Sequence, residues 1–336
     1  MKIKNKFTSK KNVVVTGGAG FIGSNLVDKL VKENYKVIVI DNFATGQMKN
    51  LLKSKKKIKI LKADIYLDKK KLFKHLKNID CIFHLAGLAD IVPSINDPIK
   101  YFNVNVLGTL NILEAARKNK IKKIIYAASA SCYGIPENYP TRETDKIKTE
   151  YPYATTKYLG EKLILDWVKI YNMKNCSLRL FNVYGRRSRT TGAYGAVFGV
   201  FLSQKLSRKP LTIVGNGKQT RDFVHVDDVV SAFLQALKFA KPGSIFNIGS
   251  GRETNINYIA DLISDLKTFI PKRPGEPDRS LAFIEKTKKI LKWYPKVKIN
   301  DGVNNLLKNL KDYKDAPLWT PKKIKKATKI WFKYLK

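Results

Sequence analysis

The chain has 336 residues and carries 65 Lys and Arg against 27 Asp and Glu, a formal net charge of +38. A chain of this length buries a large core and commonly divides into two lobes. It has no apolar run near the roughly 18 residues that a membrane helix needs, and its basic start lacks the apolar segment of a signal peptide. These features predict a cytoplasmic protein without membrane insertion.

The lysine excess is spread among Ile and Asn, as in 53–59 and 322–329, and no nucleic-acid recognition motif accompanies it. We therefore expect no specific nucleic-acid partner. Three cysteines, Cys81, Cys132 and Cys176, are widely spaced and form no C-x-x-C pair. This pattern is typical of buried thiols in a reducing compartment, so neither disulfides nor a metal site is predicted.

The first predicted element is a β-branched strand over 12–16 that runs into Gly17, Gly20 and Gly23 and then into a helical pattern. Glycines allow the backbone to turn tightly and to approach a pyrophosphate closely. The N–H groups at the start of the following helix then point at the anion. The stretch therefore predicts a phosphate-binding turn.

A second strand over 36–41 ends in Asp41, 18 residues after Gly23. A carboxylate at this place accepts hydrogen bonds from the ribose hydroxyls of a dinucleotide and repels a 2′-phosphate. The pair of features favours NAD over NADP as the cofactor.

Strand-like and helix-like patterns alternate through the first half of the chain, which is typical of a parallel sheet covered on both faces. The expected strands are 12–16, 36–41, 58–62, 80–84, 123–128 and 176–181, and the expected helices lie near 22–33, 68–77, 98–118 and 153–171. The fold class is thus α/β, a Rossmann-type doubly wound sheet.

After residue 181 the alternation ends. We expect 1–181 to form the NAD-binding domain, with 222–250 returning to it, and 182–221 and 251–336 to form a smaller α/β substrate-binding lobe. The segment from Gly192 to Gly199 is expected to shape the substrate pocket.

The tail from 322 to 336 has the pattern of a basic amphipathic helix. Its apolar face is predicted to dock on the protein's own core, the alternative being an anionic membrane surface. The residues expected on that face are Ile324, Ala327, Trp331, Tyr334 and Leu335.

Tyr153 and Lys157 form a Y-x-x-x-K pair, one helical turn apart and on one face. The motif alone is weak, because it recurs at Tyr66, Tyr158 and Tyr294. Context selects Tyr153, which follows a proline suited to a helix start and comes 24 residues after Ser129, at the end of a predicted strand. In a doubly wound sheet the carboxyl ends of the strands face the ligand.

These residue types suit the oxidation of a secondary alcohol. A base must take the hydroxyl proton, and a tyrosine with its ordinary pKa of about 10 is a poor base at neutral pH. We expect the ammonium of Lys157 and the positive nicotinamide to lower the pKa of Tyr153, and Lys157 also to hold the cofactor ribose. Ser129 is expected to hydrogen-bond the substrate oxygen.

Several further segments complete a recognisable set, and with them the chain resembles the extended short-chain dehydrogenases/reductases that act on nucleotide sugars, in the UDP-glucose and UDP-N-acetylglucosamine 4-epimerase group. The resemblance spans essentially the whole chain. The matching segments are 16–23, 41–43, 63–65, 84–87, 103–105, 129–134, Tyr153 with Lys157, 179–185, 221–228 and 273–276.

The resemblance implies NAD as cofactor, a nucleotide sugar as substrate, with a UDP-sugar favoured, and a homodimer paired through the helices near 98–118 and 153–171. It implies catalytic roles for Ser129, Tyr153 and Lys157. Besides Tyr153 and Lys157, the cofactor-binding residues would be Gly17, Gly20, Phe21, Ile22, Gly23, Asp41, Asn42, Asp64, Ile65, Leu85, Ala86, Gly87 and Asn105. The substrate-binding residues would be Ser131, Asn182, Arg221, Arg273, Glu276 and Ser280.

Two departures from related enzymes bear on the reaction. Dehydratases of the family carry Thr-Asp-Glu where this chain has Ser129-Ala130-Ser131, and sugar-acid decarboxylases commonly keep a Glu at Ser131. The resemblance therefore favours inversion at C4 of an NDP-hexose or NDP-N-acetylhexosamine, with dehydration, decarboxylation or another oxidoreduction as the alternative. A NAD-binding regulatory protein is disfavoured, because both Tyr153 and Lys157 are present. At Ser280 a small side chain would leave room for an N-acetyl group, and Glu276 replaces the Asp usual in the family.

Overall fold

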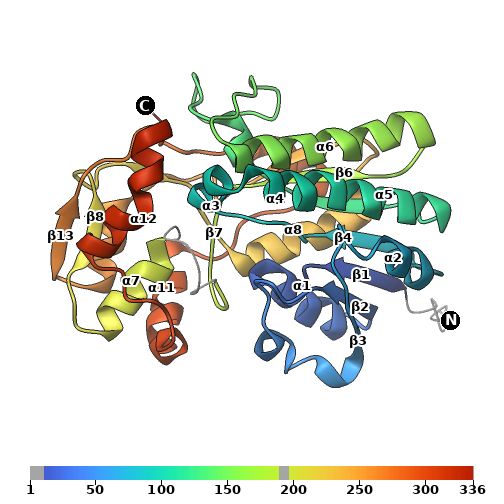
Figure 1. The fold of residues 1–336 in the computed structure, drawn as a ribbon, viewed down its shortest axis with the longest axis horizontal. Helices are drawn as coiled ribbons and strands as arrows, with labels where there is room; N and C mark the ends of the chain where they lie inside the picture. The colour runs from blue at the N-terminus through green and yellow to red at the C-terminus, as the bar shows by residue number, and fades with distance from the viewer. Residues whose placement is uncertain (1–10, 189–196, 336) are drawn as a thin grey trace, which may run out of the picture.

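The computed structural model describes residues 11–188 and 197–335. Its centre is a seven-stranded parallel sheet in the order β11-β6-β5-β4-β1-β2-β3, as predicted for a doubly wound fold. Figure 1 shows helices on both sides of this sheet. The strands are β1 (Asn12–Thr16), β2 (Lys36–Asp41), β3 (Ile58–Lys62), β4 (Cys81–His84), β5 (Ile124–Ser129), β6 (Cys176–Leu180) and β11 (Ile245–Ile248).

Helices cover both faces of the sheet because alternate strand residues are apolar on both sides. Val13 and Val15 pack toward the layer of α1 and α8, whereas Val14 packs toward the layer of α2, α5 and α6. The helices of the large lobe are α1 (Phe21–Lys32), α2 (Lys69–His75), α3 (Ile91–Asn96), α4 (Pro98–Phe102), α5 (Gly108–Lys118), α6 (Pro152–Tyr171), α8 (Val226–Phe239) and α10 (Glu285–Leu291).

The helix predicted near 98–118 is divided. A π-helical turn, η3 (Asn103–Leu107), joins α4 to α5. Such turns are frequent at functional sites. Here the turn carries Asn105, whose amide faces the loop after β4.

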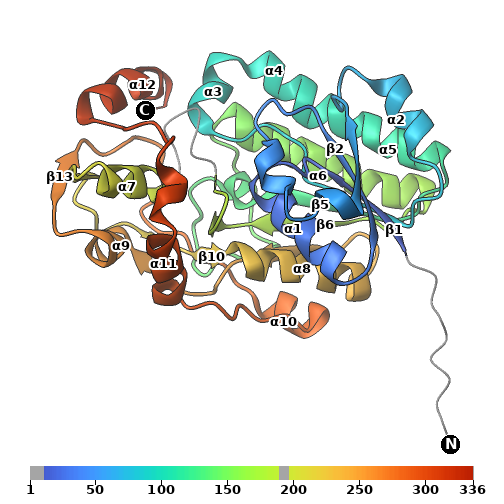
Figure 2. The same ribbon diagram turned by 90° about the horizontal axis from the view of Figure 1, so that it is seen from below.

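The smaller lobe lies at one end of the sheet (Figure 2) and has its own apolar core, which includes Tyr184, Phe198, Phe201, Ile259 and Val303. Within the described residues, its strands pair as β7 with β10, β8 with β13 and β9 with β12. These strands are β7 (Asn182–Tyr184), β8 (Leu211–Val214), β9 (Thr220–Arg221), β10 (Phe223–His225), β12 (Thr254–Asn255) and β13 (Lys267–Ile270). The helices are α7 (Val197–Leu206), α9 (Ile256–Ile263), α11 (Ile299–Lys308) and α12 (Pro321–Tyr334).

Two expected boundaries need correction. Strand β10, in the segment expected to return to the large domain, pairs with β7, and its Phe223 lies in the small lobe's core. Conversely, Leu291 and Trp293 pack in the core beneath the sheet, although 251–336 was assigned to the substrate lobe. Both segments connect the lobes, so a domain boundary placed at a single residue would divide residues that pack together.

The C-terminal helix docks on the protein, as predicted. Ile324 and Trp331 are buried, but Tyr334 is 58 % exposed and does not belong to the docked face. Of the segment expected to shape the pocket, 192–196 lies outside the described residues, and Phe198 stacks on Tyr184 in the lobe's core. Among the described helices, none combines the length and apolarity needed to cross a membrane.

Candidate active site

The glycine turn after β1 has the geometry that the sequence predicts. Gly17 has φ 67°, and a Cβ on it would lie 2.7 Å from the backbone nitrogen of Ala86. A Cβ on Gly23 would lie 2.2 Å from the carbonyl oxygen of Gly17, so both positions require glycine. Helix α1 begins at Phe21, and no side chain caps its N-terminus.

This turn forms part of the wall of a cleft of about 1080 Å³ at the carboxyl ends of the strands. The cleft is partly apolar and has a helix N-terminus at one side, which fits a dinucleotide. The predicted cofactor residues that line it are Gly17, Gly20, Phe21, Ile22, Gly23, Asp41, Asn42, Asp64, Ile65, Leu85, Ala86 and Gly87.

Asp41 also fixes the backbone around it through hydrogen bonds. Its carboxylate accepts hydrogen bonds from the backbone nitrogens of Ala19, at 2.9 Å, and Phe43, at 2.8 Å. Burial raises the pKa of Asp41, and these two bonds oppose the rise. Each carboxylate oxygen has a second lone pair, so Asp41 can fix the glycine turn and still accept a hydrogen bond from a ligand in the cleft.

Asn105, in contrast, is not part of the cleft wall. Its amide accepts from the backbone nitrogen of Leu88 at 2.7 Å, donates to the carbonyl oxygen of Leu88 at 3.0 Å and donates to Thr156. All its polar atoms are thus used inside the protein. Asn105 thus clamps the loop after β4, which lines the cleft, and a direct contact of Asn105 with the cofactor stays a prediction.

Tyr153 and Lys157 lie in the first turns of α6, which starts at Pro152. The ring of Tyr153 lies parallel to that of Tyr151, with centroids 6.4 Å apart, and meets the edge of Tyr101 at 6.5 Å. Tyr153 also hydrogen-bonds Ser129, at the end of β5. The strand and the helix thus bring together two of the three predicted catalytic side chains.

Burial has the largest effect on the pKa of Tyr153. Burial raises the pKa of Tyr153, and the hydrogen bond with Ser129 only opposes this rise. Lys157, four residues further along α6, is itself buried. Its Nζ lies 4.3 Å from the centre of the Tyr126 ring, and a Cβ on Gly87 in the cleft wall would be 3.8 Å from it.

Burial lowers the pKa of Lys157 to about 7, and the negative charge of Glu161 opposes this. Glu161 lies one turn further along α6 and is 1 % exposed. It pairs with Arg179 at 2.6 Å and accepts from the hydroxyl of Ser177. Glu161 was not predicted as part of the site. The four-residue spacing of Lys157 and Glu161, which puts both on one helix face, is the signal in the sequence that could have indicated it.

A second cavity, of about 220 Å³, adjoins Ser129. It brings together all but one of the predicted substrate-binding residues, although they are far apart in sequence. The predicted residues in its wall are Ser129, Ser131, Asn182, Arg221, Glu276 and Ser280. Tyr151 also lines it, a residue that the sequence analysis did not select.

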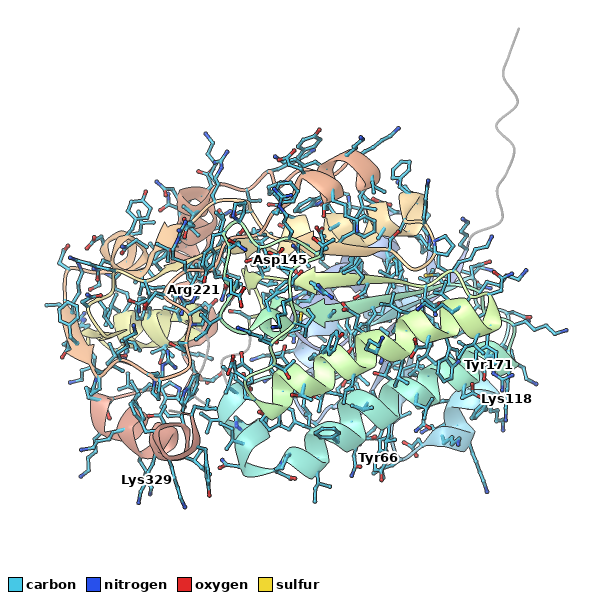
Figure 3. The ribbon with its side chains drawn as sticks, turned by 90° about the horizontal axis from the view of Figure 1, so that it is seen from above. Tyr66, Lys118, Asp145, Tyr171, Arg221 and Lys329 are labelled. Carbon is cyan, nitrogen blue, oxygen red and sulfur yellow. The ribbon has the colours of Figure 1, made fainter. Side chains whose placement is uncertain are left out.

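Arg221 lies between the two lobes (Figure 3), on the short strand β9. Arg273 is not in the cavity wall. Its guanidinium lies 3.3 Å from the carboxylate of Glu276 and 5.0 Å from the centre of the Trp331 ring, so it stands behind Glu276.

The fold and the cleft define a Rossmann-type α/β protein with a dinucleotide site. The model of the NAD dependent epimerase/dehydratase family matches residues 13–249. The chain belongs to this family, as its resemblance predicted.

Individual relatives carry different activities in their names. A putative UDP-glucose 4-epimerase of Methanocaldococcus jannaschii is 37% identical over 310 residues, 89% of this chain and 98% of that protein. A UDP-N-acetyl-alpha-D-glucosaminuronate decarboxylase of Bacillus cytotoxicus is 36% identical over 262 residues, 76% of this chain and 80% of that protein. Among solved structures, a UDP-N-acetylglucosamine 4-epimerase of Methanobrevibacter ruminantium M1, in complex with UDP-N-acetylmuramic acid, has a TM-score of 0.83 at 32% identity and covers 90% of this chain and 100% of that one.

Proposed function

We propose that this protein is an NAD-dependent epimerase that inverts C4 of a nucleotide sugar through a transient 4-keto sugar. One observation carries the proposal. Lys157 adjoins Gly87 in the wall of the dinucleotide cleft, Ser129 lines the smaller cavity, and Tyr153 hydrogen-bonds Ser129. The three side chains thus stand where a cofactor in the cleft and a sugar in the cavity would meet.

The chemistry needs a proton acceptor at the 4-hydroxyl. The glycine turn and Asp41 would hold NAD in the cleft, and the bound cofactor would supply reversible hydride transfer at C4. Tyr153 takes the hydroxyl proton and gives it back, while Ser129 hydrogen-bonds the same oxygen. Because burial raises the pKa of Tyr153, positive charge at the cleft must favour its phenolate, and Lys157 supplies part of that charge.

Arg221 is suited to hold the diphosphate of the substrate, since a guanidinium binds phosphate oxygens through two parallel hydrogen bonds. Arg273 stands behind it in the same charge cluster. Anchoring at the diphosphate leaves the sugar ring free to turn. An epimerase requires this freedom, because the second hydride transfer must reach the opposite face of C4.

Decarboxylation is the second candidate, because a decarboxylase is among the relatives. The short helix after β5 argues for epimerisation. Ser131 donates its hydroxyl to that of Ser129 at 2.8 Å, and neither Ala130 nor Ser131 is an acid. The cavity thus lacks, at these two positions, the carboxyl groups that the sister reactions use.

The substrate is proposed to be a UDP-hexose or a UDP-N-acetylhexosamine. Ser280 lies in the cavity wall, where its small side chain leaves space beside the sugar. The purified protein, given such substrates and no added cofactor, is expected to yield the C4 epimers on chromatography. Carbon dioxide, or a product that lacks the 6-hydroxyl, would assign a sister reaction instead.

A cytoplasmic homodimer is also proposed. Ile99, Phe102 and Leu107, on α4 and the π-turn, are 72 %, 39 % and 42 % exposed. An apolar side chain exposed on a helix is stabilised when a second subunit covers it. These residues lie on the helices through which subunits of the resembling enzymes pair.

A further inference from the structure

Residues 273–276 form a tight turn that carries an arginine and a glutamate side by side. Gly275 has φ 71°, which reverses the chain so that the side chains of Arg273 and Glu276 meet at 3.3 Å. Helix α12 holds this turn in place, because the indole of Trp331 donates to the carbonyl oxygen of Pro274 at 2.7 Å. The position of the Glu276 carboxylate is therefore built into the fold.

The same carboxylate also faces Arg221, which comes from β9 in a distant part of the sequence. The distance from Glu276 Oε2 to Arg221 Nη2 is 3.9 Å. Burial lowers the pKa of Arg221, Glu276 opposes this, and the charge of Arg273 adds to the lowering. The two guanidiniums thus repel each other, and Glu276 is the anion between them.

The other charged groups nearby are paired among themselves. Arg279 pairs with Glu253 at 2.7 Å, and Lys272 pairs with Asp278 at 2.7 Å. Among the residues that the structure describes, Arg221, Arg273 and Glu276 thus form a cluster of two cations and one anion, and the charge of Asp278 also acts on Arg221. The arginine donors that a diphosphate would use already face a carboxylate of the protein.

We propose that Glu276 is a built-in competitor for the diphosphate of the substrate, which sets how tightly the nucleotide is held. This rests on the proposed function only in that Arg221 binds the diphosphate, with Arg273 behind Glu276. A phosphate that binds Arg221 lies close to the Glu276 carboxylate. The repulsion between the phosphate and the carboxylate offsets part of the attraction between the phosphate and the guanidinium. Without Glu276 the affinity for the diphosphate would be higher and the product would leave more slowly. The expected advantage of Glu276 is therefore faster release of the product.

A carboxylate that binds ribose hydroxyls, as the Asp usual in the family does, would act in the opposite direction. Its removal would weaken nucleotide binding. The longer Glu276 side chain instead reaches the arginines. The sign of the change in affinity therefore separates the two roles.

The test is titration calorimetry of UDP and of inorganic diphosphate against the NAD-loaded protein and its Glu276→Gln variant. The amide of Gln keeps the size of the side chain and removes its charge. Glu285→Gln is the matched control, because it removes the same charge from a surface pair with Lys288. NAD content and melting temperature verify that the variants fold.

Glu276→Gln is expected to bind both ligands about 10-fold more tightly, equivalent to about 1.4 kcal/mol, with no change in Glu285→Gln. Unchanged or weaker binding of inorganic diphosphate would overturn the proposal, and weaker binding of UDP alone would assign Glu276 to the ribose. Neither readout requires epimerisation. A protein that binds diphosphate as expected but does not epimerise sugars would contradict the proposed function and leave this inference standing.

Discussion

Lys157 combines a charge with a buried position, and its replacement by methionine is expected to stabilise the protein while abolishing activity. The side chain is 7 % exposed, and burial lowers its pKa to about 7. In an unfolded chain a lysine has a pKa of about 10.4. Between these values the unfolded chain binds more protons than the folded protein, so folding is opposed by Lys157 at neutral pH and less so as the pH rises.

The size of the effect follows from the two pKa values. At pH 7 the folded lysine is half protonated, and the difference between its pKa values in the folded and unfolded states costs about 4 kcal/mol of folding free energy. At pH 10.4 the same two pKa values give a folding cost of only about 0.4 kcal/mol. The surroundings are consistent with this cost. The Tyr126 ring covers the ammonium of Lys157, and Glu161 is the carboxylate that opposes the lowering of its pKa. The charge of Lys157 in turn helps to lower the pKa of buried His84.

The assay is urea unfolding of the wild type and of Lys157→Met, both stripped of NAD, at several pH values from 7 to 10.4. The advantage of the variant should shrink by about 4 kcal/mol across this range. Lys162→Met is the control, because Lys162 is exposed on the same helix and should show no such trend. A difference between wild type and Lys157→Met that stays constant with pH would refute the reasoning.

Three further predictions concern the site and the assembly. Tyr153→Phe should lower turnover by several orders of magnitude and leave NAD bound, since it removes only the proton acceptor. Tyr158→Phe should be mild, because Tyr158 packs against the apolar cluster of Cys132 and Phe181, and the reverse ranking would discredit the choice of Tyr153. Ser280→Tyr should lower activity on a UDP-N-acetylhexosamine about 10-fold more than on the matching hexose, as a clash of about 1.4 kcal/mol would. Equal effects on both substrates would place the gate elsewhere. Light scattering at micromolar concentration should give a dimer, and a monomer would exclude pairing through α4 to α6.

Local sequence patterns were sufficient to predict the dinucleotide cleft. The glycine turn and Asp41 each depend on a few consecutive residues, and the alternation of strands and helices leaves few ways to connect them. The predicted strands of the sheet therefore agree with the structure to within a residue at their ends. The same reasoning placed Tyr153 correctly at the start of α6.

Longer-range features were not readable in this way. The strands of the small lobe have two to four residues, too few for a pattern, and they pair across long separations. The role of Asn105 in clamping the loop was not readable, because the direction of its amide is set by the π-turn and by Leu88, which periodicity does not reveal. The burial that raises the pKa of Tyr153 was also not readable, because it depends on side chains from several elements that pack around the ring.

The most direct test of C4 inversion uses a UDP-sugar that carries deuterium at C4, incubated with the purified protein without added cofactor. If the hydride leaves C4 and returns to the same carbon, NMR of the product will find the deuterium retained at C4 in the opposite configuration. Deuterium moved to C6, or loss of the label to solvent, would contradict epimerisation through a 4-keto sugar.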